Sequence, residues 1–144
     1  MRAADRRGQY DRLRPGTVIL SRIQPAAVPE SAAPFSQVVL DDQYAFLSGL
    51  VAADFPAGLE VLGDAAAETR AVLATIGEIL QELKLSPDRI VKVEVHLADL
   101  DDFDAMDAAY RDFFDGNAYP ARTTVESKRL FGDSKVEITC QVRR

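Results

Sequence analysis

Two stretches in which apolar residues have helical spacing restrict most strongly how this chain can fold. They lie among segments in which apolar and polar residues alternate. Apolar residues recur three or four positions apart over residues 62–83 and again over 103–113. This spacing predicts two helices that each have one apolar face. Asp64 is the expected N-cap of the first helix because its carboxylate can accept from free backbone amides, and Ser86–Pro87 should end that helix.

The alternating segments predict strands, because side chains of a strand point to its two faces in turn. Such alternation occurs over residues 37–40, 44–52, 91–97, 122–126 and 136–142, and an apolar run at 18–23 indicates one more strand in front. The first two of these segments should form a hairpin through Asp41–Asp42. The expected fold class is therefore α+β, with the order β-β-α-β-α-β-β.

One face of the predicted sheet has no cover within the chain. Strand–helix–strand crossovers are right-handed, so both helices should lie on the same face of a single mixed sheet. The apolar groups on the other face would then be exposed. We expect that face to pack against another subunit.

Length and charge narrow the range of functions. The 144 residues predict one domain over 18–144, preceded by a basic extension over 1–17. The formal net charge of −6 disfavours nucleic-acid binding, which needs a basic surface. The single cysteine, Cys140, cannot form an internal disulfide and fits a reducing cytoplasm. No apolar run reaches the length of a membrane span.

Three other motifs favour structural roles over chemical ones. His96 falls on the polar side of its strand, where an exposed residue is the simplest interpretation. The acidic run over 99–104 lacks the Gly and Glu of a calcium loop, since those positions hold Asp104 and Tyr110. These carboxylates are expected to cap the second helix. Ser48 has no nucleophile-elbow pattern around it, which disfavours a serine hydrolase. We also expect no metal site.

The last two strands hold the most informative polar residues. Arg122 and Thr124 on one strand and Glu137 on the other alternate with apolar residues. If these strands pair through a turn near residues 131–133, Thr124 lies opposite Glu137 and Arg122 lies diagonally from it. Arginine can grip a carboxylate with two parallel hydrogen bonds, and a glutamate can orient water. A surface ion pair of little energetic weight explains the same pattern.

Four segments, in this order, resemble the Rid family (reactive intermediate deaminases, also called YjgF-type or endoribonuclease L-PSP proteins). Residues 119–126 read YPARTTVE and are similar to the family's C-terminal signature around Pro-Ala-Arg. Three further family motifs resemble KVEI at 135–138, FLSG at 46–49 and VKVEVHLADLDDF at 91–103. The likeness covers residues 34–144.

The resemblance implies a chorismate-mutase-like fold that assembles as a homotrimeric barrel with clefts at the subunit interfaces. It implies hydrolytic deamination of small imines or enamines that carry a carboxylate, such as 2-aminoacrylate, without a cofactor. Arg122 would bind the substrate carboxylate and Glu137 would position water. The other residues that it implies at the substrate are Phe35, Ser48, Gly49, Asp107 and Thr124.

The chain departs from the family pattern at several of these positions. Phe35 stands where the family often has tyrosine, Thr124 where it often has cysteine, and Asp107 where it often has asparagine. Thr139 replaces a second glutamate of the last strand, and the loop over 50–58 differs from the usual one. Two alternatives stay open: a non-catalytic module that binds small carboxylates, and a deaminase for a larger acid of aminomuconate type.

Overall fold

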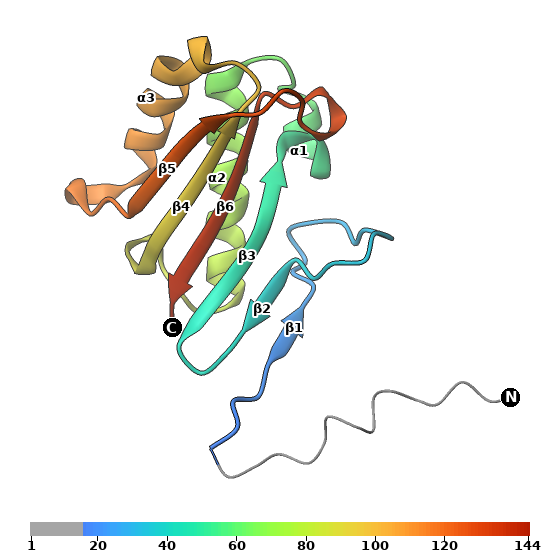
Figure 1. Cartoon of the computed structure of the whole chain (residues 1–144), viewed down its shortest axis with the longest axis vertical. Coiled ribbons are helices and arrows are strands. Elements are labelled where there is room, and N and C mark those ends of the chain that lie inside the picture. The colour runs from blue at the N-terminus through green and yellow to red at the C-terminus, as the bar shows by residue number, and fades with distance from the viewer. Residues whose placement is uncertain (1–15) are drawn as a thin grey trace, which may run out of the picture.

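A six-stranded mixed sheet organises the protein (Figure 1). The computed structural model describes residues 16–144. In spatial order the strands are β1 (Ser21–Ile23), β2 (Val38–Leu40), β3 (Tyr44–Val51), β6 (Val136–Arg143), β4 (Ile90–Leu97) and β5 (Ala121–Glu126). Neighbouring strands are antiparallel except β4 and β5, which run parallel.

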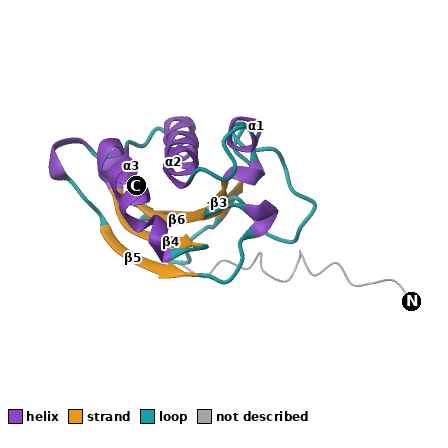
Figure 2. Ribbon diagram, turned by 90° about the horizontal axis from the view of Figure 1, so that it is seen from above, coloured by secondary structure: helices purple, strands orange, loops and turns teal. Residues whose placement is uncertain are grey.

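The helices cover one face of this sheet and leave the other face open (Figure 2). They are α1 (Pro56–Leu59), α2 (Ala65–Glu82) and α3 (Phe103–Phe113). The core between the two layers is apolar and almost wholly buried, with Leu73 and Ile76 of α2 packed in the same cluster as Leu97 and Ile138 of the sheet. The predicted placement of both long helices on one face is confirmed. Within residues 16–144 no helix is long and apolar enough to cross a membrane.

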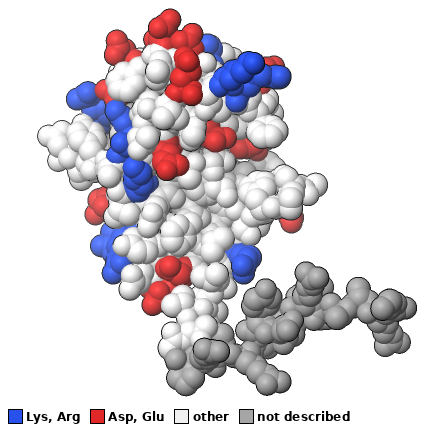
Figure 3. All heavy atoms as spheres, viewed as in Figure 1, with Lys and Arg blue, Asp and Glu red and all other residues white. Residues whose placement is uncertain are grey.

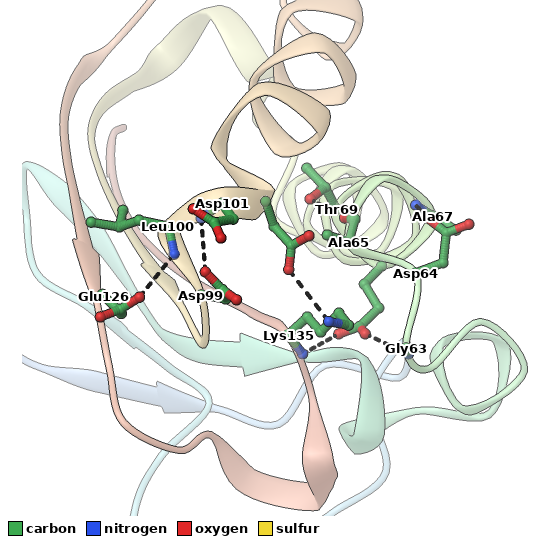
Figure 4. Close-up of polar contacts among 12 residues, drawn as sticks. Gly63, Asp64, Ala65, Ala67, Thr69, Asp99, Leu100, Asp101, Glu126 and Lys135 are labelled. Atoms are coloured by element: carbon green, nitrogen blue, oxygen red, sulfur yellow. Dashed lines mark hydrogen bonds and ion pairs between the residues drawn. The ribbon is translucent and has the colours of Figure 1, made fainter.

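Most element boundaries agree with the predicted ones to within a few residues. α2 begins after Asp64, whose side chain accepts from the backbone N–H of Ala67 at 3.0 Å, as an N-cap does (Figure 4). The strand expected in front is β1, which pairs with β2. Of the extension predicted over residues 1–17, residues 1–15 lie outside the described part of the chain.

The predicted hairpin between the last two strands is wrong. β4 lies between β5 and β6 and pairs with both. β5 follows α3 and returns parallel to β4, which is the geometry of a strand–helix–strand crossover. The connection over residues 127–135 then carries the chain to the far side of β4. Two strands that follow one another in the sequence are here not neighbours in the sheet.

The pairing of β3 with β6 is interrupted at Ser48 and Gly49. The register shifts between Leu47 and Leu50, so these two residues form a bulge. The Ser48 hydroxyl donates to the carbonyl oxygen of Ser36 at 2.6 Å and ties the bulge to the chain that enters β2. A glycine inside a strand often marks such a bulge, as Gly49 does here.

A buried carboxylate joins α2 to the start of β6. Glu68 is fully buried and accepts from the backbone N–H groups of Gly63 and Lys135, both at 2.8 Å (Figure 4). We expect Glu68→Ala to lower the free energy of unfolding by about 2–4 kcal/mol, because two backbone donors lose their acceptor. Urea unfolding measures this, with Glu78→Ala at an exposed position of the same helix as the control. A loss no larger than that of the control would contradict this expectation.

The open face of the sheet carries a mixture of uncharged and charged side chains (Figure 3). Phe46 of β3 and Val125 of β5 lie on this face, and each is 40% exposed. They are separated by β6 and β4, whose side chains on the same face include Glu94 and Glu137, so this face is a mixed apolar and polar surface. The structure retains an uncovered sheet face, which is the feature from which the sequence predicted an oligomer.

Candidate functional site

Arg122 extends from β5 toward α3. Its Nη1 donates to Oδ1 of Asp107 at 2.8 Å. Its Cζ lies 4.7 Å from the ring centroid of Tyr110 and 5.5 Å from that of Phe103, distances at which a cation is attracted to an aromatic ring. All three partners belong to α3. They hold the guanidinium on the helix-covered side of the sheet. The side chain of Arg122 is 24% exposed.

A cavity of about 350 Å³ opens beside this guanidinium. This arginine cavity is lined by Asp107, Tyr110, Arg111, Tyr119, Pro120 and Arg122. Asp107 lies between two cations, because Nη2 of Arg111 is 3.1 Å from its Oδ2. The hydrogen bond and charge of Arg122, followed by those of Arg111, lower the pKa of Asp107 against the opposing effect of burial. Two guanidiniums and one carboxylate give the cavity a net positive charge, which suits an anion.

Two hydroxyl groups near Arg122 lack hydrogen-bond partners in the described part of the chain. They are Oη of Tyr110 and Oγ1 of Thr124, and both atoms are buried. Burial raises the pKa of Tyr110 to about 12, so its phenol keeps the proton. Thr124 lies two residues beyond Arg122, on the same side of β5. Buried polar groups without partners are uncommon, and they point to a lining that a bound group completes.

Glu137 lies on the opposite face of the sheet. It is level with His96 of β4, whereas its neighbour Ile138 is fully buried beneath the helices. The expectation that Arg122 and Glu137 share a face is therefore wrong within one chain. Thr124 is not opposite Glu137 either, since β4 separates their strands.

A second cavity, of about 620 Å³, contains Glu137. Among the residues that line this glutamate cavity are Glu30, Phe35, Gln37, Ser48, Gly49, Asp54, Phe131 and Glu137. Gly49 packs against the Glu137 carboxyl group: a Cβ added at Gly49 would lie 2.9 Å from Cδ of Glu137. The missing side chain at the bulge thus leaves room for the carboxylate.

The implied site residues thus form two groups on one chain. Phe35, Ser48 and Gly49 lie with Glu137, whereas Asp107 lines the arginine cavity and Thr124 lies beside Arg122 on β5. Sequence reasoning missed four residues of the arginine cavity, namely Tyr110, Arg111, Tyr119 and Pro120. The spacing of three and four residues from Asp107 was a usable signal for the first two, because it places them on one side of a helix.

The weaker motifs have structural roles. Nδ1 of His96 lies 3.1 Å from Oγ of Ser127, and the ring is half-buried rather than exposed. Asp99 accepts from the backbone N–H of Asp101 at 2.8 Å and caps the turn that leads into α3 (Figure 4). Residues 16–144 contain no cluster of three or more His, Cys, Asp or Glu side chains that could hold a metal ion.

Cys140 is a buried thiol near the centre of the sheet. It is 3% exposed, and burial raises its pKa to about 12, so the reactive thiolate is scarce at neutral pH. We expect a disulfide reagent such as DTNB at pH 8 to label the folded protein at least about 100-fold more slowly than the unfolded protein. The same burial predicts that Cys140→Ala changes the function of the protein little. Labelling of the folded protein as fast as that of the unfolded protein would contradict this assignment.

Solved structures share the fold described above. The chain aligns with TdcF of E. coli, crystallised with bound serine, with a TM-score of 0.77 and 30% identity over 86% of this chain and 98% of that one. It aligns with the Rid-family protein YyfA of Yersinia pestis with a TM-score of 0.79 and 26% identity over 88% and 100% of the two chains. The fold is the chorismate-mutase-like α+β fold of these proteins.

Sequence comparison narrows this class to one family. The model described as endoribonuclease L-PSP matches residues 25–143. The chain is 37% identical to the RutC family protein slr0709 of Synechocystis over 120 residues. The aligned region covers 82% of this chain and 92% of that protein. It is 34% identical over 116 residues to human 2-iminobutanoate/2-iminopropanoate deaminase, and the aligned region covers 81% of this chain and 84% of that enzyme. The chain belongs to the Rid, or endoribonuclease L-PSP, family.

Proposed function

We propose that the protein hydrolyses small imines or enamines that carry a carboxylate, giving 2-oxo acids and ammonia. The observation that carries the proposal is the free edge of the Arg122 guanidinium. Nη1 is bonded to Asp107, whereas Nη2 and Nε have no partner among residues 16–144. Two parallel donors on a rigid plane match the two oxygens of a carboxylate.

Glu137 is the residue that we assign to water. With the carboxylate held, water adds to the imine carbon, and the carbinolamine that forms loses ammonia to leave the 2-oxo acid. Glu137 accepts a proton from the attacking water and returns it to the departing nitrogen. The protonated imine carbon is electrophilic by itself, so positioning and charge are sufficient and no cofactor takes part.

Arg122 and Glu137 can act together only where two copies of the chain share a site, since they lie on opposite faces of one sheet. A homotrimer that packs the open sheet faces around a central barrel, as the family resemblance implies, would bring the arginine cavity of one copy to the glutamate cavity of the next. The sheet face that no helix covers, on which Phe46 and Val125 are exposed, supports this assembly. Light scattering should then give a trimer mass, and a monomer at micromolar concentration would contradict the shared site.

The charges of the two cavities complement an imino acid. The arginine cavity has a net positive charge, whereas the glutamate cavity holds Glu30, Asp54 and Glu137 without lysine or arginine. The carboxylate of a 2-aminoacrylate-like acid would lie in the first cavity and its protonated nitrogen would face the second. The names of the human and rat relatives describe deaminases of such acids, 2-iminobutanoate and 2-iminopropanoate, and this likeness supports the same class here.

Ammonia release tests the proposal. An amino acid oxidase generates imines in situ from a panel of amino acids, and the wild-type protein should accelerate the release of ammonia. Arg122→Ala should abolish most of the acceleration, whereas Arg70→Ala, at an exposed position on α2, should not. Wild-type protein that accelerates none of these reactions would rule out deamination of this class.

A non-catalytic module that binds small carboxylates is the second candidate. The observation that favours it is the ion pair of Arg122 with Asp107, which places a carboxylate of the protein itself on the arginine. For such a module, titrated 2-oxo acids bind to the wild type and not to Arg122→Ala, while no imine is hydrolysed. A deaminase of larger acids of aminomuconate type would instead act only when the panel includes ring-opened acids. The net charge of −6 disfavours RNA as a ligand.

A further inference from the structure

We infer that Arg111 is a second anchor for anionic groups, and that the site prefers acids with two carboxylates. The inference rests on the function proposed above and names its substrate class. One carboxylate would lie on the free edge of Arg122, and the other would lie on Arg111 at the mouth of the same cavity.

The two arginines differ in how firmly they are held. Arg122 is stacked against Tyr110 and Phe103 and is mostly covered, whereas the side chain of Arg111 is 66% exposed. The contact of Arg111 with Asp107 is an exposed pair four residues apart on one helix, and pairs of this kind contribute little to stability. Arg111 can therefore leave Asp107 for a ligand, while Asp107 keeps its shorter bond to Arg122.

The spacing of the two guanidiniums suits a short diacid. Both bond to one carboxylate group, at 2.8 and 3.1 Å, so they lie on either side of a single small anion. The free edge of Arg122 and the exposed end of Arg111 can then reach two carboxylates joined through roughly two or three carbons. A cavity of about 350 Å³ has room for an acid of this size.

An independent observation indicates that the lining is incomplete as it stands. Tyr110 lines the cavity, is 4% exposed, and has a hydroxyl without a partner among the described residues. Its raised pKa, about 12, keeps it a hydrogen-bond donor. A donor in this position beside two guanidiniums favours an acceptor-rich anion over a neutral ligand.

The test compares a diacid imine with a monoacid imine, generated in situ from glutamate and from alanine. Wild type should prefer the diacid, and Arg111→Ala should lower the diacid-to-monoacid ratio of kcat/KM by about 10- to 100-fold, mainly through KM. Arg111→Lys should restore part of the ratio, because the charge is kept and the fork is lost. The matched control Arg70→Ala should leave the ratio unchanged. An equal loss for both substrates, or no loss for either, would overturn the inference.

A binding measurement separates this inference from the proposed reaction. If the wild type hydrolyses no imine of the whole amino-acid panel, the proposed function fails, and Arg111 is judged by titration with 2-oxoglutarate and 2-oxobutyrate. Tighter binding of 2-oxoglutarate that Arg111→Ala removes would support the second anchor. Equal binding of the two acids, or no binding of either, would overturn it.

Discussion

Arg122→Ala is expected to lower kcat/KM for imine hydrolysis by about 30- to 1,000-fold. The reason is the loss of a charge-assisted, two-point contact in a partly shielded cavity, which contributes about 2–4 kcal/mol to transition-state binding. Arg122→Lys should recover only part of this, because an ammonium keeps the charge without the planar pair of donors. Steady-state ammonia release measures the loss, with Arg70→Ala as the control.

If Arg122 only stabilises the fold, its substitution should have a different effect on kcat/KM. Its ion pair is with Asp107 and not with Glu137, and the pair lies near the surface at the edge of the sheet. A pair that only stabilises the fold would change kcat/KM little in either variant. Titration of 2-oxobutyrate decides the matter: wild type and Arg122→Ala that bind it equally would show that Arg122 is not the anchor.

The sequence predicted the elements well because each depends on a local period. The spacing in α2 and the alternation in β4 reflect which residues meet the core, and that core is a single layer between helices and sheet. The bulge at Ser48 and Gly49 was also readable, because glycine is otherwise unfavourable inside a strand.

The alternation of apolar and polar residues does not predict which strand β5 pairs with. Its side chains alternate as Arg122, Thr123, Thr124 and Val125, a pattern that predicts the apolar Val125 on the core side. In the structure Val125 is on the open face, and Arg122 is level with the buried Val93. A strand at the edge of a sheet has no second neighbour, and α3 covers its inner side with polar as well as aromatic groups, so the usual rule of apolar residues inward fails there.

The sequence predicted which residues belong to the site but not how they are arranged in space. Asp107 and Arg111, four residues apart on a helix, have the pattern of an ordinary solvated face. Only the position of β5 beneath α3 turns that pair into the lining of a cavity with Arg122. The separation of Arg122 from Glu137 likewise depends on β4 lying between their strands, which is a long-range property of the sheet.

Glu137→Gln is expected to lower kcat by about 100-fold or more, while binding of 2-oxobutyrate stays close to that of wild type. Glutamine keeps the volume that packs over Gly49 but cannot accept a proton from water. Glu78→Gln, at an exposed position of α2, is the control for loss of a negative charge. Full activity of Glu137→Gln would exclude Glu137 as the general base.

Mixing the two inactive variants tests whether Arg122 and Glu137 meet across subunits. Arg122→Ala and Glu137→Gln, refolded together in equal amounts, form trimers in which some neighbouring copies supply an intact Arg122 on one side and an intact Glu137 on the other. With random assembly about a quarter of the sites are complete, so the mixture should recover about a quarter of wild-type activity, whereas each variant refolded alone should recover almost none. Sites built within one chain could not be completed in this way, because every chain carries one of the two defects. A mixture no more active than its parts, with a trimer mass confirmed by light scattering, would contradict the shared site.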